Sequence, residues 1–225
     1  MNFRQRGEDD NLKVNFNGNI IKENEYTKFL GLFIDRKLNW KKQIEVVCNK
    51  LSKYSYMIRK LSKVTSRKTL IIAYHSYVVS ALRYGIIFWG NSTNRELAFR
   101  AQKRCVRAIM NVRSDDSCQP LFKSLRLLTL PCLYIYECAL FIKTNNDAFQ
   151  FSSRARHVTK LQTIEGKTAL LRKSILGMAT KIYNKLPQNI RNIENIFEFK
   201  REIYKYLVDK CYYKIEQYLQ EKTLN

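Results

Sequence analysis

The period of the apolar residues changes once along this chain, and that change limits the folds open to it more than any other feature. After residue 35 the large apolar side chains recur every three or four positions, as in a helix with one buried face. The first such run comprises Trp40, Ile44, Val47, Leu51, Tyr54, Ile58 and Leu61. Seven glycines and three prolines in 225 residues are too few for an all-β protein. The sequence therefore predicts a mainly α fold.

Before residue 36 the pattern is that of short strands. Apolar side chains alternate from Leu12 to Phe16, and Asn17-Gly18 then precedes a second apolar run, which is a strong β-hairpin signal. Residues 26–35 (YTKFLGLFID) predict one further and more buried strand. We expect all β-structure to end at residue 35, so the β part is a small N-terminal addition to a helical protein.

Capping and aromatic residues divide the first helical part. Ser66 is a candidate N-cap for a helix over residues 67–82, which is apolar nearly all round and is therefore expected to be buried between neighbours. Residues 84–90 (YGIIFWG) predict an aromatic turn. A second basic helix is expected to begin at Thr93 or Asn94.

Prolines and a basic stretch mark the later boundaries. Pro120 and Pro131 each fit the first turn of a helix. Between residues 149 and 165 the apolar pattern fails and basic residues collect, which indicates an exposed linker. Helical periodicity resumes at Thr168, breaks at Pro187 and returns from Phe197 to Leu219 with one interruption near Asp209. The expected organisation is a β-hairpin and strand in 1–35, a helical domain in 36–148, a basic linker in 149–166 and a C-terminal helical region in 167–225.

The charge of the chain is strongly one-sided. Lys and Arg number 41 against 19 Asp and Glu, a net charge of +22, which predicts a polyanionic partner. In residues 41–63 the side opposite the apolar run is basic apart from Glu45, and Tyr54 and Tyr56 stand among the lysines. Such a mixture suits a backbone of phosphates and sugars, whereas an ordinary solvated face carries mixed signs. The candidate nucleic-acid contacts are Lys41, Lys42, Lys50, Lys53 and Lys60 on this helix, and Arg100, Arg104 and Arg107 on the second basic helix.

Three motifs suggest catalysis or ligand binding, and each has a simpler interpretation. Asp115-Asp116 could hold a divalent cation, but without a third carboxylate helix capping is preferred. Residues 166–168 (GKT) match the end of a phosphate-binding loop, yet Leu161 stands where its first Gly is required. His75 is expected to make a polar contact in the core and His157 to lie on the surface. No catalytic and no metal-ligating residue is therefore expected.

Cysteine spacing and hydropathy indicate in which cellular compartment the protein is expected. The six cysteines form no C-x-x-C pair and two histidines cannot complete a zinc site, so buried free thiols are preferred. The most apolar stretch, residues 70–89, contains His75 and Arg83 and is a poor membrane span. The first ten residues show no apolar signal region. We expect an intracellular protein, nuclear or cytoplasmic, that is not secreted and has no membrane partner.

Seven short stretches, read in order, resemble one known family. They are residues 28–35 (KFLGLFID), 38–40 (LNW), 84–90 (YGIIFWG), 102–109 (QKRCVRAI), 121–123 (LFK), 127–136 (LLTLPCLYIY) and 182–187 (IYNKLP). Together they are similar to the C-terminal part of reverse transcriptases from non-LTR retrotransposons of the jockey type, over residues 12–215. Residues 152–157 (SSRARH) match only loosely the Y-N-T-R-like segment expected there.

This resemblance implies the end of a polymerase palm, a thumb and a C-terminal helical region. Phe29, Leu30 and Gly31 would correspond to the primer grip, and the helices from Trp40 to about Val112 to the thumb, whose basic face holds the template-primer duplex. The palm of the family binds its metal ions partly through a Y-x-D-D turn, and no such turn occurs in this chain. The resemblance thus implies a fragment of an RNA-directed DNA polymerase that is inactive alone. It also implies no cofactor in this chain, because Mg²⁺ is expected only in the complete polymerase.

Two functions stay open on the sequence. The first is template-primer binding by a retrotransposon fragment, either a truncated copy or an incomplete gene model, with RNA, an RNA–DNA hybrid or DNA as partner and a missing polymerase core as a further partner. The second is a helical nucleic-acid-binding or protein-interaction module in host use, without polymerase activity. Backbone contacts carry no base identity, so the sequence does not separate RNA from DNA.

Overall fold

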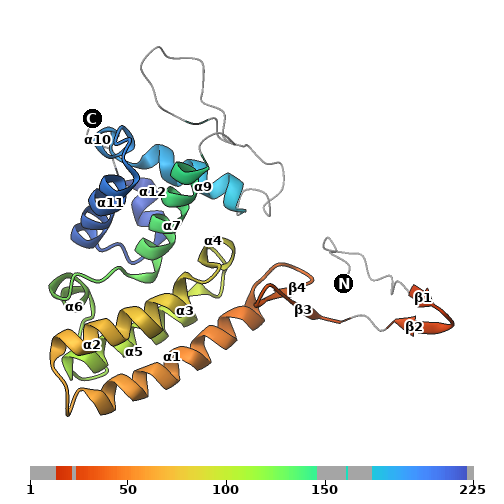
Figure 1. The fold of residues 1–225 in the computed structure, drawn as a ribbon, viewed down its shortest axis with the longest axis horizontal. Helices are drawn as coiled ribbons and strands as arrows, with labels where there is room; N and C mark the ends of the chain where they lie inside the picture. Colours follow the sequence, from red (N-terminus) through yellow and green to blue (C-terminus); the bar gives the residue numbers. More distant parts are fainter. Residues whose placement is uncertain (1–13, 22–23, 146–160, 162–173, 222–225) are drawn as a thin grey trace.

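The computed structural model describes residues 14–21, 24–145, 161 and 174–221. Within them, two β-hairpins precede a helical body, which confirms the prediction of a mainly α protein with a small N-terminal β part (Figure 1). The strands are β1 (Val14–Phe16), β2 (Asn19–Ile21), β3 (Tyr26–Phe29) and β4 (Leu32–Asp35). The helices are α1 (Lys41–Leu61), α2 (Arg67–Ala73), the π-helical η1 (Tyr74–Val79), α3 (Ser80–Arg83), α4 (Ile86–Trp89), α5 (Arg95–Met110), α6 (Gln119–Ser124), α7 (Leu130–Thr144), α9 (Ile175–Lys185), α10 (Gln188–Arg191), α11 (Ile196–Lys210) and α12 (Ile215–Gln220).

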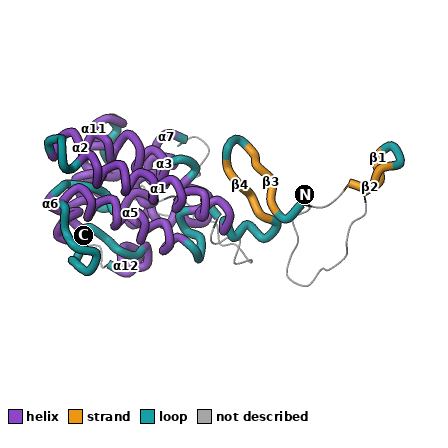
Figure 2. Tube along the Cα trace, turned by 90° about the horizontal axis from the view of Figure 1, so that it is seen from below, coloured by secondary structure: helices purple, strands orange, loops and turns teal. Residues whose placement is uncertain are grey.

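Both hairpins close through two residues in the left-handed region, and the first of them, β1–β2, stands clear of the helices (Figure 2). Asn17 and Gly18 have φ angles of 50° and 78°, which confirms the predicted Asn-Gly hairpin. Leu30 and Gly31, with φ angles of 45° and 81°, close β3 and β4 in the same way. The prediction of one buried strand over residues 26–35 is therefore wrong, since β3 is exposed and β4 half-buried. An apolar run that contains a glycine fits a tight turn as well as a buried strand.

Three helical segments lie side by side in the half of the body that follows β4. Helices α1 and α5 run in the same direction (Figure 1). The continuous segment of α2, η1 and α3 lies between them in the chain and runs in the opposite direction. The predicted stripe of α1 is buried at Ile44, Val47, Leu51 and Ile58. At mid-length the Leu51 carbonyl accepts a hydrogen bond from the Cys105 thiol at 3.4 Å, which ties α1 to α5.

The segment from α2 to α3 corrects two expectations. Ser66 caps it as predicted, because its Oγ accepts the Thr69 N–H at 3.3 Å. Burial on all sides is wrong: Leu70 and its neighbours on one face are buried, while Ile72 and Tyr77 on the other are exposed. Exposed apolar side chains are common in folded proteins, so apolar composition alone does not decide burial. The expected aromatic turn over residues 84–90 contains the short helix α4.

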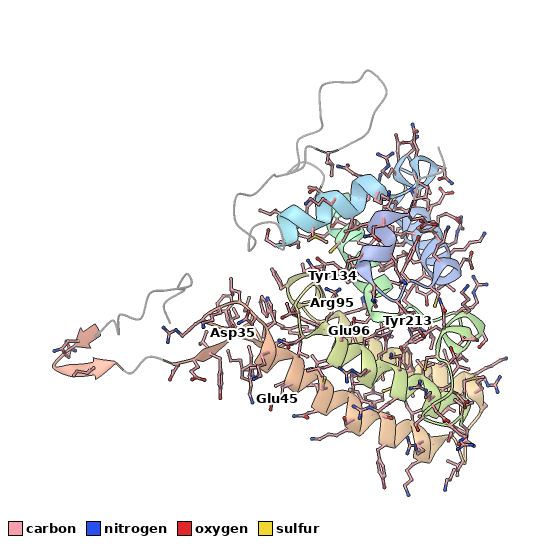
Figure 3. The ribbon with its side chains drawn as sticks, turned by 180° about the vertical axis from the view of Figure 1, so that it is seen from behind. Asp35, Glu45, Arg95, Glu96, Tyr134 and Tyr213 are labelled. Atoms are coloured by element: carbon pink, nitrogen blue, oxygen red, sulfur yellow. The ribbon has the colours of Figure 1, made fainter. Side chains whose placement is uncertain are left out.

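Helices α7 and α9 to α12 form the second half of the body, where Thr129 links the start of α7 to the segment after α11, and the ion pair of Arg95 with Glu216 joins this half to the first. Thr129 caps α7 by accepting the Cys132 N–H at 3.3 Å, and its hydroxyl donates to the Tyr212 carbonyl at 2.5 Å. Arg95, at the start of α5, donates to both carboxylate oxygens of Glu216 on α12 at 2.9 and 3.0 Å. Figure 3 shows Arg95 where α5 approaches α7, close to Tyr134.

Three expectations for the C-terminal third change. Leu161, within the predicted exposed linker, is buried, and its N–H and carbonyl both pair with the Asn184 amide at 2.8 Å. The rest of that linker and the expected helix start at Thr168 lie outside the described residues. Within the described residues, α9 begins at Ile175, with Ser174 as its N-cap. The interruption expected near Asp209 falls at residues 211–214, after Cys211 ends α11 with a φ of 51°.

The thiols match their prediction. All six cysteines are free; five are buried and Cys48 is half-buried. Burial raises the pKa of Cys105, Cys132 and Cys138 to about 12, which keeps these thiols protonated and unreactive at neutral pH. No helix within the described part of the chain is long and apolar enough to cross a membrane.

Candidate nucleic-acid interface

Asp35 fixes the junction between the β3–β4 hairpin and α1. Its Oδ1 accepts the N–H groups of Lys37 and Asn39 at 3.1 and 2.9 Å, and its Oδ2 accepts the Trp40 N–H at 2.6 Å. Trp40 is the N-cap in the left-handed region, with a φ of 60°, so including it in the helical stripe was wrong. Its ring instead stacks on Phe88 at 6.2 Å. The carboxylate thus sets the direction in which α1 leaves the hairpin (Figure 3).

Four lysines form a row on the side of α1 away from the core. At about 100° per residue, Lys42, Lys53 and Lys60 lie almost opposite Leu51, and Lys50 lies about 80° from them. These four lysines are termed the outer row. Lys50, Lys53 and Lys60 are exposed and have no carboxylate partner among the described residues, whereas Lys42 is half-exposed and pairs with Glu45 at 3.1 Å.

The tyrosines among these lysines take different positions. Tyr56 is exposed, and the Lys60 ammonium lies 5.4 Å from the centroid of its ring, a cation–π contact on the outer face. Tyr54 is half-buried and packs against Tyr77 of η1 with ring centroids 5.4 Å apart. Of these two tyrosines, only Tyr56 therefore adds an aromatic ring to the outer face of α1.

The second basic helix approaches α1 from one flank. Lys41 and Arg59 both lie at about 80° from Leu51, on the side of α1 that carries Cys48. Burial raises the pKa of the Cys48 thiol, and the nearby charge of Arg104 on α5 opposes that rise, which places Arg104 beside this flank. Arg100 stands one helical turn before Arg104, and both are exposed.

Arg107 has a different environment from the other two candidate arginines. It is half-buried, and its Nε and Nη2 donate to the Asp116 carbonyl at 3.0 and 2.7 Å. The guanidinium therefore braces the loop between α5 and α6. The structure brings Arg100 and Arg104 to the exposed flank beside α1 and holds Arg107 on this loop.

The residues that resemble a primer grip form the tip of the second hairpin. Phe29 and Leu30 are 61% and 76% exposed. The Tyr84 hydroxyl donates to the Leu30 carbonyl, and a Cβ on Gly31 would lie 2.9 Å from that hydroxyl. Gly31 therefore serves both the positive φ of the turn and the close seating of the hairpin on the junction between α3 and α4.

The motifs that were not assigned a catalytic role make structural contacts, and some of these contacts differ from those expected. Asp116 accepts the Arg113 N–H at 2.8 Å and Asp115 lies 3.7 Å from the Arg113 guanidinium, so the two aspartates order a loop. The prediction that they cap a helix is wrong, because Cys118 is the N-cap of α6. His75 is exposed, which contradicts its expected place in the core. His157 and residues 166–168 lie outside the described residues. Across the part of the chain that is described, no three His, Cys, Asp or Glu side chains gather into a metal site.

Two sets of residues were not predicted from the sequence: Asp35 at this surface, and three basic residues on the second half of the body. Asp35 had a local signal, since Asp side chains commonly accept backbone N–H bonds a few residues onward. Arg126, Lys200 and Lys205 had none, because they come from segments far apart in the chain and meet only in the folded protein, where they line an open hollow.

The fold and this surface define a mainly helical, strongly basic protein whose two basic helices pack side by side. No protein family, no curated protein and no solved structure matched the chain.

Proposed function

We propose that this chain binds nucleic acid through the phosphate backbone, as the template-primer-binding part of a reverse transcriptase from a jockey-type non-LTR retrotransposon. The family part of the proposal rests on the seven stretches that resemble it. On this proposal, the hairpins correspond to the end of the palm, α1 to α5 to the thumb, and α6 to α12 to the C-terminal helical region.

The outer row is the observation that carries the proposal. Residues 41–63 contain seven Lys and Arg and one acid, Glu45, a net charge of 7 − 1 = +6. Like charges three or four positions apart destabilise an isolated helix, by about 0.2–0.5 kcal/mol per pair. Three of the four lysines of this face have no carboxylate partner among the described residues. A polyanion bound to this face would neutralise their charge and so remove the destabilising repulsion.

A protein partner is the second candidate function, and the hairpin seat favours it. Phe29, Leu30, Tyr84 and Phe88 are all exposed around the contact between the hairpin tip and α4. A contiguous patch of exposed apolar side chains commonly marks a protein-binding surface. In the polymerase proposal this surface would receive the rest of the polymerase; in a host module it would receive another protein.

Salt dependence tests the main proposal directly. We expect the chain to bind a primed RNA–DNA hybrid at low salt and to lose at least about a hundredfold in affinity between about 50 and 200 mM salt, because four or more phosphate contacts release counterions. Fluorescence anisotropy with two hybrids of unrelated sequence should give affinities within a few-fold of each other. A flat titration, or no binding at low salt, would remove the proposal.

Primer extension tests the inactive-fragment part of the proposal. We expect no template-dependent incorporation of labelled deoxynucleotides with Mg²⁺ or Mn²⁺, because the sequence has no Y-x-D-D turn and Asp115 and Asp116 order a loop instead. The matched variant is Asp116→Asn. Extension by the wild-type chain that this variant abolishes would contradict the expectation.

A further inference from the structure

A basic hollow opens on the second half of the body, on helices other than α1. It has a volume of about 550 Å³ and is lined by Arg126 of the α6–α7 loop, Tyr136 of α7, and Lys200, Arg201, Glu202, Tyr204 and Lys205 of α11. The two tyrosine rings meet edge to face, with centroids 6.1 Å apart and an interplanar angle of 89°. Burial raises the pKa of both phenols, so both stay neutral hydroxyls at physiological pH.

Three of the four basic side chains of this hollow are not matched by acids. No carboxylate of the described residues lies within 4 Å of Arg126, Lys200 or Lys205, and the one acid of the lining, Glu202, is paired with Arg201 at 3.1 Å. Lys200 is half-buried, with its ammonium 5.8 Å from the centroid of the Phe197 ring.

The backbone that presents Arg126 is held in place. Its φ of 53° lies in the left-handed region, its N–H donates to the Lys123 carbonyl at 3.0 Å, and its own carbonyl accepts the Tyr204 hydroxyl at 2.9 Å. Tyr204 is thus a positioning residue that joins the loop to α11.

We propose that this hollow binds one nucleotide unit of a single-stranded nucleic acid, with its phosphate on Arg126, Lys200 and Lys205 and its base against Tyr136. A phosphate next to an aromatic ring is the combination used for unpaired strands, because every base has a face that can stack. A duplex does not fit this description, since its bases are already stacked on one another.

This inference rests on the proposed nucleic-acid function and adds to it a second site on different helices. The outer row belongs to α1, whereas the hollow is built from α7, α11 and the α6–α7 loop. A strand leaving a duplex on α1 would therefore find a separate place on the second half of the body. Because the two sites share no residue, variants can test each one alone.

The experiment measures binding of a fluorescent 12-nucleotide oligouridine, and of an abasic strand of equal length, by anisotropy. The double variant Lys200→Gln/Lys205→Gln should bind oligouridine about 20-fold more weakly at about 100 mM salt and lose about 1.4 units of salt slope. The matched control is Lys37→Gln/Lys68→Gln, which makes the same charge change at two exposed lysines outside the hollow and should bind as the wild type.

Tyr136 variants test the base. Tyr136→Leu should weaken oligouridine about tenfold and leave the abasic strand unchanged, while Tyr136→Phe, which keeps the ring, should bind as the wild type. With 5-iodouridine in the strand, photocrosslinking followed by mass spectrometry should place the crosslink on Tyr136.

The outcomes separate the two proposals. Wild-type affinity for oligouridine in the Lys200→Gln/Lys205→Gln variant overturns the hollow, whatever the duplex result, and so does an equal loss on both strands in Tyr136→Leu. A wild-type chain that binds oligouridine but not the hybrid, or hybrid binding that is unchanged in the outer-row glutamine variant, would leave the hollow standing and overturn the duplex interface. A wild-type chain that binds neither probe at low salt overturns both.

Discussion

Changing the outer row to glutamine should weaken binding to a primed hybrid several thousandfold at about 100 mM salt, because each lost lysine–phosphate contact removes about 0.9 units of salt slope. The variant replaces Lys42, Lys50, Lys53 and Lys60, none of which is buried in the core. Glutamine has nearly the helix propensity of lysine, so circular dichroism should show unchanged helical content. The salt slope itself should flatten by up to about 3.6 units.

The control for this variant keeps the charge. Lys→Arg at the same four positions should bind within a few-fold of the wild type and keep the full salt slope, because a phosphate contact survives the exchange. A third variant, Arg100→Gln/Arg104→Gln, measures the flank beside α1 and should lose up to about 1.8 units of slope. Unchanged binding by the folded glutamine variant would show that α1 is not the interface, and the arginines of α5 would then be the first alternative.

Leu51→Ala should lower the free energy of unfolding by about 2–5 kcal/mol, the range for a buried leucine whose removal leaves a cavity. Leu51 is fully buried where α1 meets α5, and its carbonyl accepts the Cys105 thiol. Urea unfolding followed by circular dichroism measures the loss. The fraction that remains folded should bind the hybrid as the wild type does, because Leu51 lies on the opposite side of α1 from most of the outer row.

The matched control for the core is Leu97→Ala on α5. Leu97 is 47% exposed, so the same loss of side chain should cost less than about 1 kcal/mol. Equal losses at Leu51 and Leu97 would contradict the packing of α1 against α5. Loss of binding in folded Leu51→Ala would instead indicate that the spacing of the two helices matters to the interface.

The sequence predicted those parts of the fold that depend on neighbours along the chain. The stripe through Ile44, Leu51 and Ile58 follows from helical period, and the first hairpin follows from Asn17-Gly18, whose turn chemistry is local. The cap of α2 at Ser66 is local in the same sense. Each of these features involves residues within a few positions of one another, where composition and spacing determine the geometry.

Contacts between segments that are distant in the chain could not be predicted from the sequence in this way. The bond from Tyr84 to Leu30 joins residues 54 positions apart, and the bond from Tyr204 to Arg126 joins residues 78 apart. These contacts are why residues 26–35 fold back as a hairpin seated on α4, and why a basic hollow forms on α11. Leu161 was misjudged for the same reason, since its partner Asn184 lies 23 residues further on.

The basic surface shows a similar division. Net charge and helical phase predicted which side of α1 is cationic, because both can be counted from the sequence. Which cations have partners depends on the tertiary fold: Arg107 is held by the Asp116 carbonyl, and the hollow collects Arg126, Lys200 and Lys205. Charge counts therefore predict that a polyanion is the partner, and the fold decides which residues meet it.

The unbroken length of α1 has a consequence for the size of any duplex bound there. Its 21 residues rise about 31 Å, and the axial distance from Lys42 to Lys60 is about 27 Å. One turn of B-form DNA is about 34 Å, so these lysines span most of a turn, or about eight base pairs, of such a duplex. Because the three hydrogen bonds to Asp35 fix the start of α1 against the hairpin, that footprint begins at a constant distance from the hairpin tip, and shorter duplexes cannot reach both ends of the row.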